Sequence, residues 1–276
     1  MDKLEIALNR DYKVVKANDI IQKARYDLTI TELKTFAFIL SKVKPNDQKG
    51  QTYSFTINEF CQICGLKRNN GGNIKAVKKA LKSLADESFW VVDDNGQHVL
   101  VRWISEPIVD PRSGRITVGF GKNMDNYVFG LLENYTQYSL LSTLPMKSSY
   151  SFRIYELLKS YAFTEIHSFD IDDLKAKIGA TTYVNFKDFR KKCLDVATTE
   201  INSYTDLEIS WEPIKKGKKV GEVKFYIKQR DRWGQVEASY RATEKLDGQY
   251  SIFDYDLEKT LNDQDVKTIG TVKITG

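Results

Sequence analysis

The first residues in this chain that could carry out chemistry are Cys61 and Cys64, which have the Cys-x-x-Cys spacing of many zinc sites. A structural zinc site needs four ligands, but Cys193, His98 and His167 lie far away in the sequence. The chain also has no phosphate-binding P-loop signature and no serine-triad pattern. We therefore predict no metal, no cofactor and no enzymatic activity, and we expect Cys64 to be a small core residue.

Basic residues along a long helix suggest a different chemistry, the binding of DNA phosphates and base edges. At 100° per residue, 185–203 predicts a helix with Phe189 and Ile201 on its core face. Arg190 falls within the apolar arc, so its guanidinium must extend past the core edge. Lysines can donate to guanine or phosphate, aspartate can accept from cytosine, and the threonine methyl can pack on thymine. The candidate DNA-binding residues here are Lys187, Asp188, Arg190, Lys191 and Thr198.

Two simpler interpretations of this helix stay open. Most charged helix faces are simply solvated. In addition, Asp188 could close a capping box with Asn185 instead of contacting a base. The position of the helix favours DNA binding over a merely solvated face, because the second helix of a helix-turn-helix inserts its first residues into the major groove.

A second lysine-rich helix is predicted at 73–87. Its apolar arc consists of Ile74, Val77, Leu81, Leu84 and Ala85. The opposite face carries lysines and no acidic residue, which suits contacts to phosphates better than contacts to bases. With the turn before it, this helix gives the candidate set of the first domain: Arg68, Asn69, Lys75, Lys79 and Lys82.

Each long helix is followed by a predicted hairpin, and the two hairpin tips differ in charge. The second tip, at 215–219, contains Lys215, Lys216, Lys218 and Lys219, which suits a phosphate backbone, although a soluble turn is the alternative. The first tip, at 93–96, contains two aspartates, which DNA would repel. We therefore expect the first hairpin to make protein contacts, for example in a dimer.

The elements that position these residues occur twice. The blocks 54–66 and 168–180 match at an offset of 114, with serine, phenylalanine, isoleucine and glycine at equivalent places. Each predicts a strand leading into a short helix, capped at Asn58 or Asp172 and ended by glycine. Strand, helix, turn, helix and hairpin is the order of a winged helix-turn-helix. The sequence thus predicts an α+β fold with two such domains, related by internal duplication.

We place the first domain at 15–140, for dimerisation and secondary DNA contact, and the second at 146–230, for the main DNA contact. The junction lies within 133–147, and residues 1–17 are expected to be frayed. Residues 1–230 carry a net charge of +8, whereas 231–276 carry −3 and predict a weakly ordered acidic tail. Three cysteines, no signal-peptide core and no apolar run of 18 residues predict a cytoplasmic protein with no membrane span.

Two segments resemble a known family: SYSFRIYELLKSY at 149–161 and DFRKKCLDVATTEINSYTDLEISWEPIKKGKK at 188–219. They are similar to the iteron-binding plasmid replication initiators, Rep proteins with tandem winged-helix domains, and the resemblance covers about 15–230. It implies monomers that bind directly repeated sequences in double-stranded origin DNA, help to open the duplex and recruit the host initiator and helicase. It also implies dimers that form through the first domain and often repress their own gene.

The resemblance implies that Lys187, Arg190 and Lys191 make the main base contacts, while Lys75, Lys79 and Lys82 bind the other end of the site. It places the protein in the bacterial cytoplasm, on the plasmid or nucleoid. Two helices on successive turns of one DNA face predict a site of roughly 20 base pairs. The alternatives are a tandem winged-helix transcriptional repressor without origin function, and a winged-helix scaffold that binds only proteins.

Overall fold

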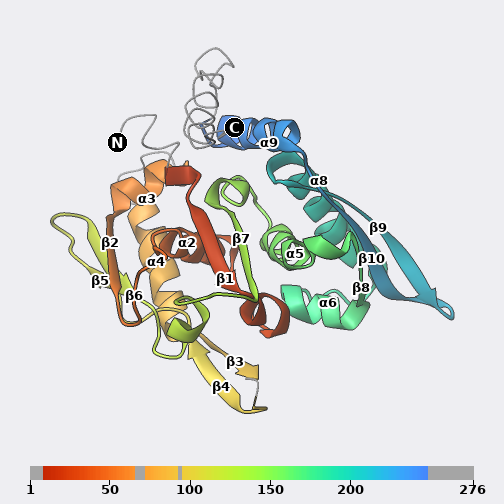
Figure 1. Cartoon of the computed structure of the whole chain (residues 1–276), viewed down its shortest axis with the longest axis horizontal. Coiled ribbons are helices and arrows are strands. Elements are labelled where there is room, and N and C mark those ends of the chain that lie inside the picture. Colours follow the sequence, from red (N-terminus) through yellow and green to blue (C-terminus); the bar gives the residue numbers. More distant parts are fainter. Residues whose placement is uncertain (1–8, 66–71, 93–94, 248–276) are drawn as a thin grey trace, which may run out of the picture.

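The computed structural model describes residues 9–65, 72–92 and 95–247. Two winged-helix domains lie next to each other, with the N-terminal domain on the left of Figure 1 and the C-terminal domain on the right. The elements of the first domain are β1 (Lys13–Ala17), η1 (Asp19–Lys23), α2 (Ile30–Leu40), β2 (Thr52–Thr56), α3 (Ile57–Ile63), α4 (Gly72–Asp86), β3 (Ser88–Val92), β4 (His98–Arg102), β5 (Ile108–Val109), β6 (Arg115–Gly119), η2 (Met124–Tyr127) and β7 (Tyr135–Ser139).

The second domain begins with the short η3 turn and ends in a C-terminal helix. Its elements are η3 (Leu140–Ser142), α5 (Ser149–Ser160), η4 (Ala162–Thr164), β8 (Ile166–Asp170), α6 (Ile171–Ile178), α7 (Phe186–Phe189), η5 (Arg190–Leu194), α8 (Asp195–Tyr204), β9 (Leu207–Lys216), β10 (Lys219–Gln229) and α9 (Arg232–Asp247). The strands of both domains pair antiparallel, in the orders β2-β6-β5, β3-β4, β1-β7 and β8-β10-β9.

The predicted duplication is present in the structure. β2 and β8 begin 114 residues apart, and each leads directly into the first helix of a helix-turn-helix. The caps, however, are Thr56 and Asp170, two residues earlier than the predicted Asn58 and Asp172. The helices begin at the apolar residue that follows each strand, so the last residue of the strand becomes the cap. Gly65 and Gly179 have positive φ values of 64° and 74°, as expected for glycines that end helices.

The prediction of a frayed start is wrong for the residues of β1. This strand pairs with β7, which lies within the predicted domain junction, and Val14 and Lys16 are both buried. The strand could not be predicted from the neighbouring residues, because a lysine such as Lys16 is normally solvated. Its partner, Glu156, is 140 residues away in the sequence.

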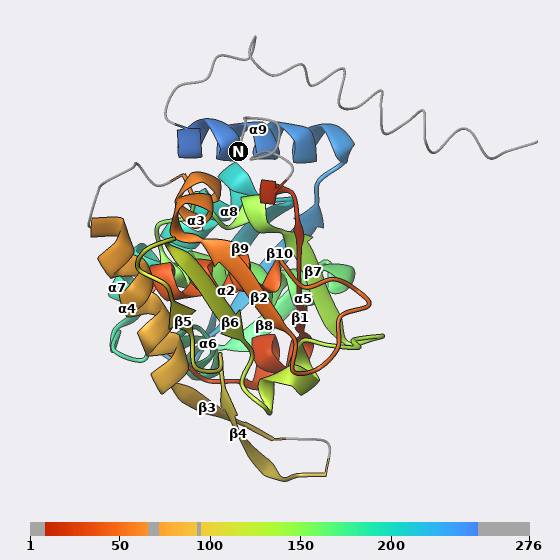
Figure 2. The same ribbon diagram turned by 90° about the vertical axis from the view of Figure 1, so that its left-hand side faces the viewer.

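The predicted boundary of the acidic tail also needs correction. Residues 232–247 form α9, which packs on α8 and buries Ala238 and Ala242. Asp247 at its end binds Arg10, whose Nη2 lies 2.8 Å from Oδ1 of Asp247, and Nε of Arg10 also donates to the carbonyl of Ile63. Helix α9 thus spans from α8 to the end of α3, as the views in Figures 1 and 2 show. Residues 248–276 lie outside the described residues.

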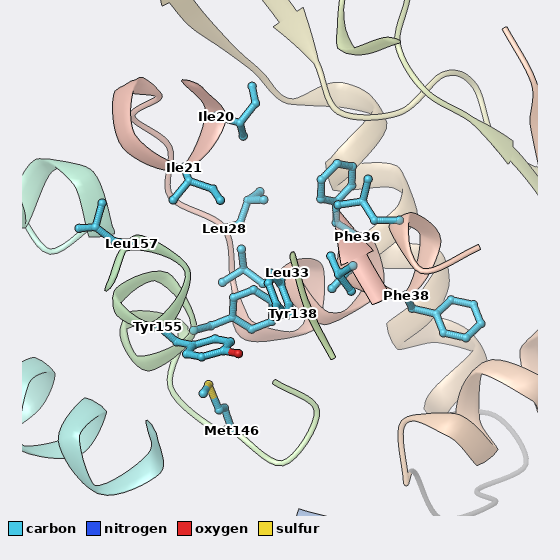
Figure 3. Packing of buried hydrophobic residues seen from close by; sticks show 14 of the residues in the cluster. Ile20, Ile21, Leu28, Leu33, Phe36, Phe38, Tyr138, Met146, Tyr155 and Leu157 are labelled. Atoms are coloured by element: carbon cyan, nitrogen blue, oxygen red, sulfur yellow. The ribbon is translucent and has the colours of Figure 1, made fainter. Parts of the chain in front are cut away.

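The cores of the two domains are continuous. Tyr155 and Leu157 of α5 face Ile21, Leu33 and Tyr138 of the first domain in Figure 3, and all five side chains are buried. Helix α5 packs on α6 and α8 and also on η1, β7 and α2, and because its packing on the elements that follow it is the more extensive we group it with the second domain. The positions of the two helix-turn-helix units are therefore coupled through α5.

Candidate nucleic-acid interface

The second helix of the C-terminal helix-turn-helix presents most of the predicted residues to solvent. Phe189, Cys193, Leu194, Ala197 and Ile201 are buried and fix the helix on its domain. The side chains of Lys187, Asp188, Arg190 and Lys191 are exposed on the other side, whereas Thr198 is half-buried and its hydroxyl donates to the carbonyl of Leu194 at 2.9 Å. The predicted set therefore shares one helix, with Thr198 in the least accessible position.

The first turn of this helix is held by a reciprocal cap. Oδ1 of Asn185 accepts from the backbone N–H of Asp188 at 2.8 Å, and Nδ2 of Asn185 donates to Oδ2 of Asp188 at 2.7 Å. This is close to the capping alternative, except that Asp188 binds the side-chain amide rather than the backbone N–H of Asn185. One carboxylate oxygen of Asp188 is thus engaged in holding the helix start.

A π turn, η5, explains the position of Arg190. A uniform α-helix would place this side chain in the apolar arc. The π turn contains one extra residue, so residues five apart align across it, and Phe189 and Leu194 are both buried. Arg190 is consequently exposed, and its Nε lies 3.2 Å from Oδ2 of Asp195, five residues later. Such turns recur at functional sites.

The lysine-rich tip of β9 and β10 is the second cationic feature of this domain. Lys215, Lys216, Lys218 and Lys219 are all exposed, and Gly217 allows the tight turn with a φ of +67°. The ammonium of Lys216 binds Glu222 at 2.8 Å and lies 3.9 Å from Oδ2 of Asp170, so it links the wing to the start of α6. The hydrogen bond to Glu222 raises the pKa of Lys216. Within the described part of the chain, the other three lysines have no carboxylate partner.

In the first domain, α4 presents Lys75, Lys79 and Lys82 to solvent, while Val77, Leu81 and Leu84 are buried. Lys82 forms an ion pair with Asp86 one turn later. Ile74, which we predicted in the core, is 40% exposed, because it lies in the first turn of the helix, before the helix reaches the core. Arg68 and Asn69 lie outside the described residues.

The hairpin of β3 and β4 has an apolar outer face, which we did not predict from the sequence. Phe89 and Val91 are buried beneath it, whereas Trp90 and Leu100 lie directly opposite each other and are 59% and 46% exposed. The sequence of the hairpin contains a signal for this face, because apolar residues on both faces of a strand indicate either two buried faces or a contact surface. The two aspartates of the tip, 93–94, lie outside the described residues.

The cysteine pair is located in the core. Cys61 and Cys64 are buried, and burial raises the pKa of the Cys64 thiol to about 12. Across 9–65, 72–92 and 95–247, no three potential metal ligands lie together. Within the same described ranges, no helix has the length and apolar character to cross a bilayer.

Two helix-turn-helix units, each followed by a two-stranded wing, define a tandem winged-helix protein. The chain belongs to the family described as "Initiator Replication protein, WH1", whose model matches residues 13–159, and the model "Initiator Rep protein, WH2" matches residues 170–227. Helix α9 lies beyond both matches.

Several known proteins are similar to this chain. A "Replication initiation protein" of Escherichia coli is 26% identical over 208 residues, which cover 71% of this chain and 64% of that relative. An "Uncharacterized 27.6 kDa protein" of Escherichia coli is 24% identical over 224 residues, which cover 75% of this chain and 90% of that protein. In a crystal structure of the Pi initiator protein with iteron DNA, the initiator shares the fold with a TM-score of 0.67 at 16% identity, covering 80% of this chain and 99% of that one.

Proposed function

We propose that the protein initiates the replication of a bacterial plasmid by binding directly repeated origin sequences, without enzymatic activity of its own. The observation that carries this proposal is the exposed cationic set on the second helix of the C-terminal helix-turn-helix, Lys187, Arg190 and Lys191. Such a helix start is the part that enters the major groove. Family membership, the relative named as a replication initiation protein and the fold shared with an initiator bound to iteron DNA support the origin as the target.

The wing supports the same DNA interface. Lys216 contacts Asp170, so the lysine tip leaves the domain on the side where α6 begins. Lys215, Lys218 and Lys219 can then reach the phosphates beside the groove that holds α7 and α8. In this proposal the wing lysines provide affinity for the DNA backbone. Lys187, Arg190 and Lys191 select the bases, and Lys75, Lys79 and Lys82 bind the other end of the site.

A dimer through the first domain is the second part of the proposal. The outer face of β3 and β4 carries Trp90 and Leu100, and exposed aromatic and aliphatic pairs of this kind mark protein contacts. The dimer would be in equilibrium with the monomer and would repress the gene of the protein. Recruitment of the host initiator and helicase, in the cytoplasm on the plasmid or nucleoid, completes the proposed role.

The experiment places the gene and its flanking DNA on a circle that has no other origin and measures replication in a bacterial host. The proposal expects maintenance of the circle, and loss of maintenance with Lys187→Ala/Lys191→Ala. A circle that replicates equally well with the variant contradicts it. A wild type that binds one inverted repeat and supports no replication would favour the repressor, and one without salt-sensitive DNA binding would favour the protein scaffold.

A further inference from the structure

The contact between the two domains contains a buried ion pair. Nζ of Lys16, on β1 of the first domain, lies 2.8 Å from Oε1 of Glu156, on α5 of the second domain. The side chains are 2% and 0% exposed, respectively. Tyr138 of β7 donates a second hydrogen bond to the same oxygen at 2.7 Å. The first domain therefore provides two donors to one buried carboxylate of the second.

The second domain holds this carboxylate with a charge of its own. Nη1 of Arg153, one helical turn earlier on α5, lies 3.4 Å from Oε2 of Glu156, and its Nη2 donates to the carbonyl of Lys177 at 2.8 Å. Arg153 and Glu156 thus offset each other's charge within α5, and Nη1 of Arg153 also contacts the hydroxyl of Tyr26 in the first domain. Lys16 is a further cation that the folded protein must desolvate, and burial lowers its pKa.

Such an arrangement is poorly explained by stability alone, because desolvation of a buried ion pair offsets much of its attraction. Buried polar groups fix one geometry in some proteins, and this pair can have that role here. Most of the surrounding contacts between α5 and the first domain are aliphatic and aromatic, as Figure 3 shows for Leu157, Ile21 and Tyr155. Two part-buried polar contacts accompany them, from Gln22 to Ser160 at 3.0 Å and between Tyr26 and Arg153. Apolar packing tolerates repacked side chains. A shift that separated Lys16 from Glu156 would leave a charge unpaired in apolar surroundings.

The orientation that these bonds select determines where the two DNA-binding helices lie relative to each other. Helix α4 belongs to the same domain as Lys16, and α7 and α8 belong to the same domain as Glu156. We propose that Lys16, Tyr138 and Glu156 are positioning residues that set the spacing between the two DNA segments bound by one protein molecule. This inference rests on the DNA binding proposed above.

The test measures affinity for DNA sites in which the two bound segments are moved apart or together by one, two or three base pairs. Each added base pair shifts one segment by about 3.4 Å and rotates it by about 35°. The wild type should bind one spacing best and lose about tenfold or more in affinity for a single base pair. Lys16→Met keeps the aliphatic part of the side chain and leaves Glu156 with Arg153 and Tyr138, so the variant is expected to fold. Its affinity for DNA should fall by less than about threefold when the spacing changes by one base pair.

Two further variants sharpen the comparison. Lys16→Met/Tyr138→Phe removes both bonds that the first domain makes to Glu156 with little change in shape, and it should flatten the spacing profile further. Lys159→Met is the matched control, because its ammonium contacts Asp206 within the second domain, and its profile should equal that of the wild type. Folded Lys16→Met and double variants that keep the wild-type profile would overturn the inference.

A second measurement needs no DNA. Spin labels on cysteines at the exposed Glu133 and Lys228, one in each domain, report the distribution of distances between the domains. The distribution should be narrow in the wild type, broader with Lys16→Met and broader still in the double variant. Distance distributions of equal width in all three proteins would overturn the inference, whether or not the wild type binds DNA. A wild type that binds no DNA would by itself refute only the proposed function.

Discussion

Thr56 and Asp170 occupy equivalent positions 114 residues apart, and each caps the first helix of a helix-turn-helix. Thr56 accepts a hydrogen bond from the backbone N–H of Glu59 at 3.0 Å. Asp170 accepts from the backbone N–H groups of Asp172 at 3.0 Å and Asp173 at 3.3 Å. The duplicated unit therefore has the same helix start in both domains, built with a hydroxyl in one and a carboxylate in the other.

Removal of the second cap should destabilise the C-terminal domain. Asp170→Ala leaves the first N–H groups of α6 without their acceptor, so we expect the free energy of unfolding to fall by about 1 kcal/mol. Asp170→Ser keeps an acceptor and should lose less. Urea denaturation followed by circular dichroism measures both variants, and equal stability of wild type and Asp170→Ala would show that the cap does not matter.

The lysines of the wing should contribute unequally to DNA affinity. Lys218→Ala or Lys219→Ala should weaken binding to all DNA sequences and reduce the slope of log affinity against log salt by about 1. Lys216→Ala should do so less, because its ammonium is already bound to Glu222. Binding titrations at several salt concentrations provide the comparison, and a salt slope that no lysine changes would remove the wing from the interface.

Changes at the start of the long helix should alter sequence choice rather than salt dependence alone. Lys187→Ala or Lys191→Ala should reduce discrimination at one base pair by about 1–3 kcal/mol. The measurement compares the affinity of each variant for the selected site and for its single-base substitutions. A loss that is the same for every sequence would mean that these lysines contact phosphates only.

Arg190 tests whether the π turn serves DNA binding. Its ion pair with Asp195 is exposed, and such pairs contribute about 0–1 kcal/mol to stability. Arg190→Ala should therefore weaken DNA binding much more than it changes the melting temperature. Asp195→Ala is the control, since it removes the ion pair and keeps the guanidinium. If both variants bind DNA like the wild type, Arg190 does not contribute to the interface.

The buried thiol of Cys64 should be unreactive in the folded protein. Burial disfavours the thiolate and raises the pKa to about 12, so the reactive form is scarce at pH 8. Iodoacetamide at that pH should leave Cys64 unmodified in the native protein and modify it in urea, as measured by mass spectrometry. Rapid native labelling would contradict its place in the core.

The fold could be predicted from the sequence where a local pattern repeats. Phe55 and Phe169 stand at matching positions of the two blocks, and the structure buries both in equivalent strands. The tandem winged-helix fold was thus predictable, as were the exposed lysines of both long helices. The path of the N-terminus was not, because Lys16 becomes a buried strand residue only through Glu156 in the other domain.

Two further features depend on contacts or geometry that periodicity cannot supply. The face of Arg190 depends on one extra residue in a π turn, whereas the sequence pattern assumes a constant 100° per residue. Helix α9 is polar over most of its length and resembles a solvated tail in sequence. It is held by packing on α8 and by the contact of Asp247 with Arg10, which is 237 residues away in the chain.

The central claim is that one protein molecule binds a long asymmetric DNA site with two helix-turn-helix units. The most direct measurement selects bound fragments from random DNA with the purified protein at about physiological salt and sequences them. We predict one asymmetric motif of about two helical turns, with tandem copies beside the gene of the protein. A palindrome, or no enriched sequence and no salt-sensitive retention of DNA, would contradict the claim.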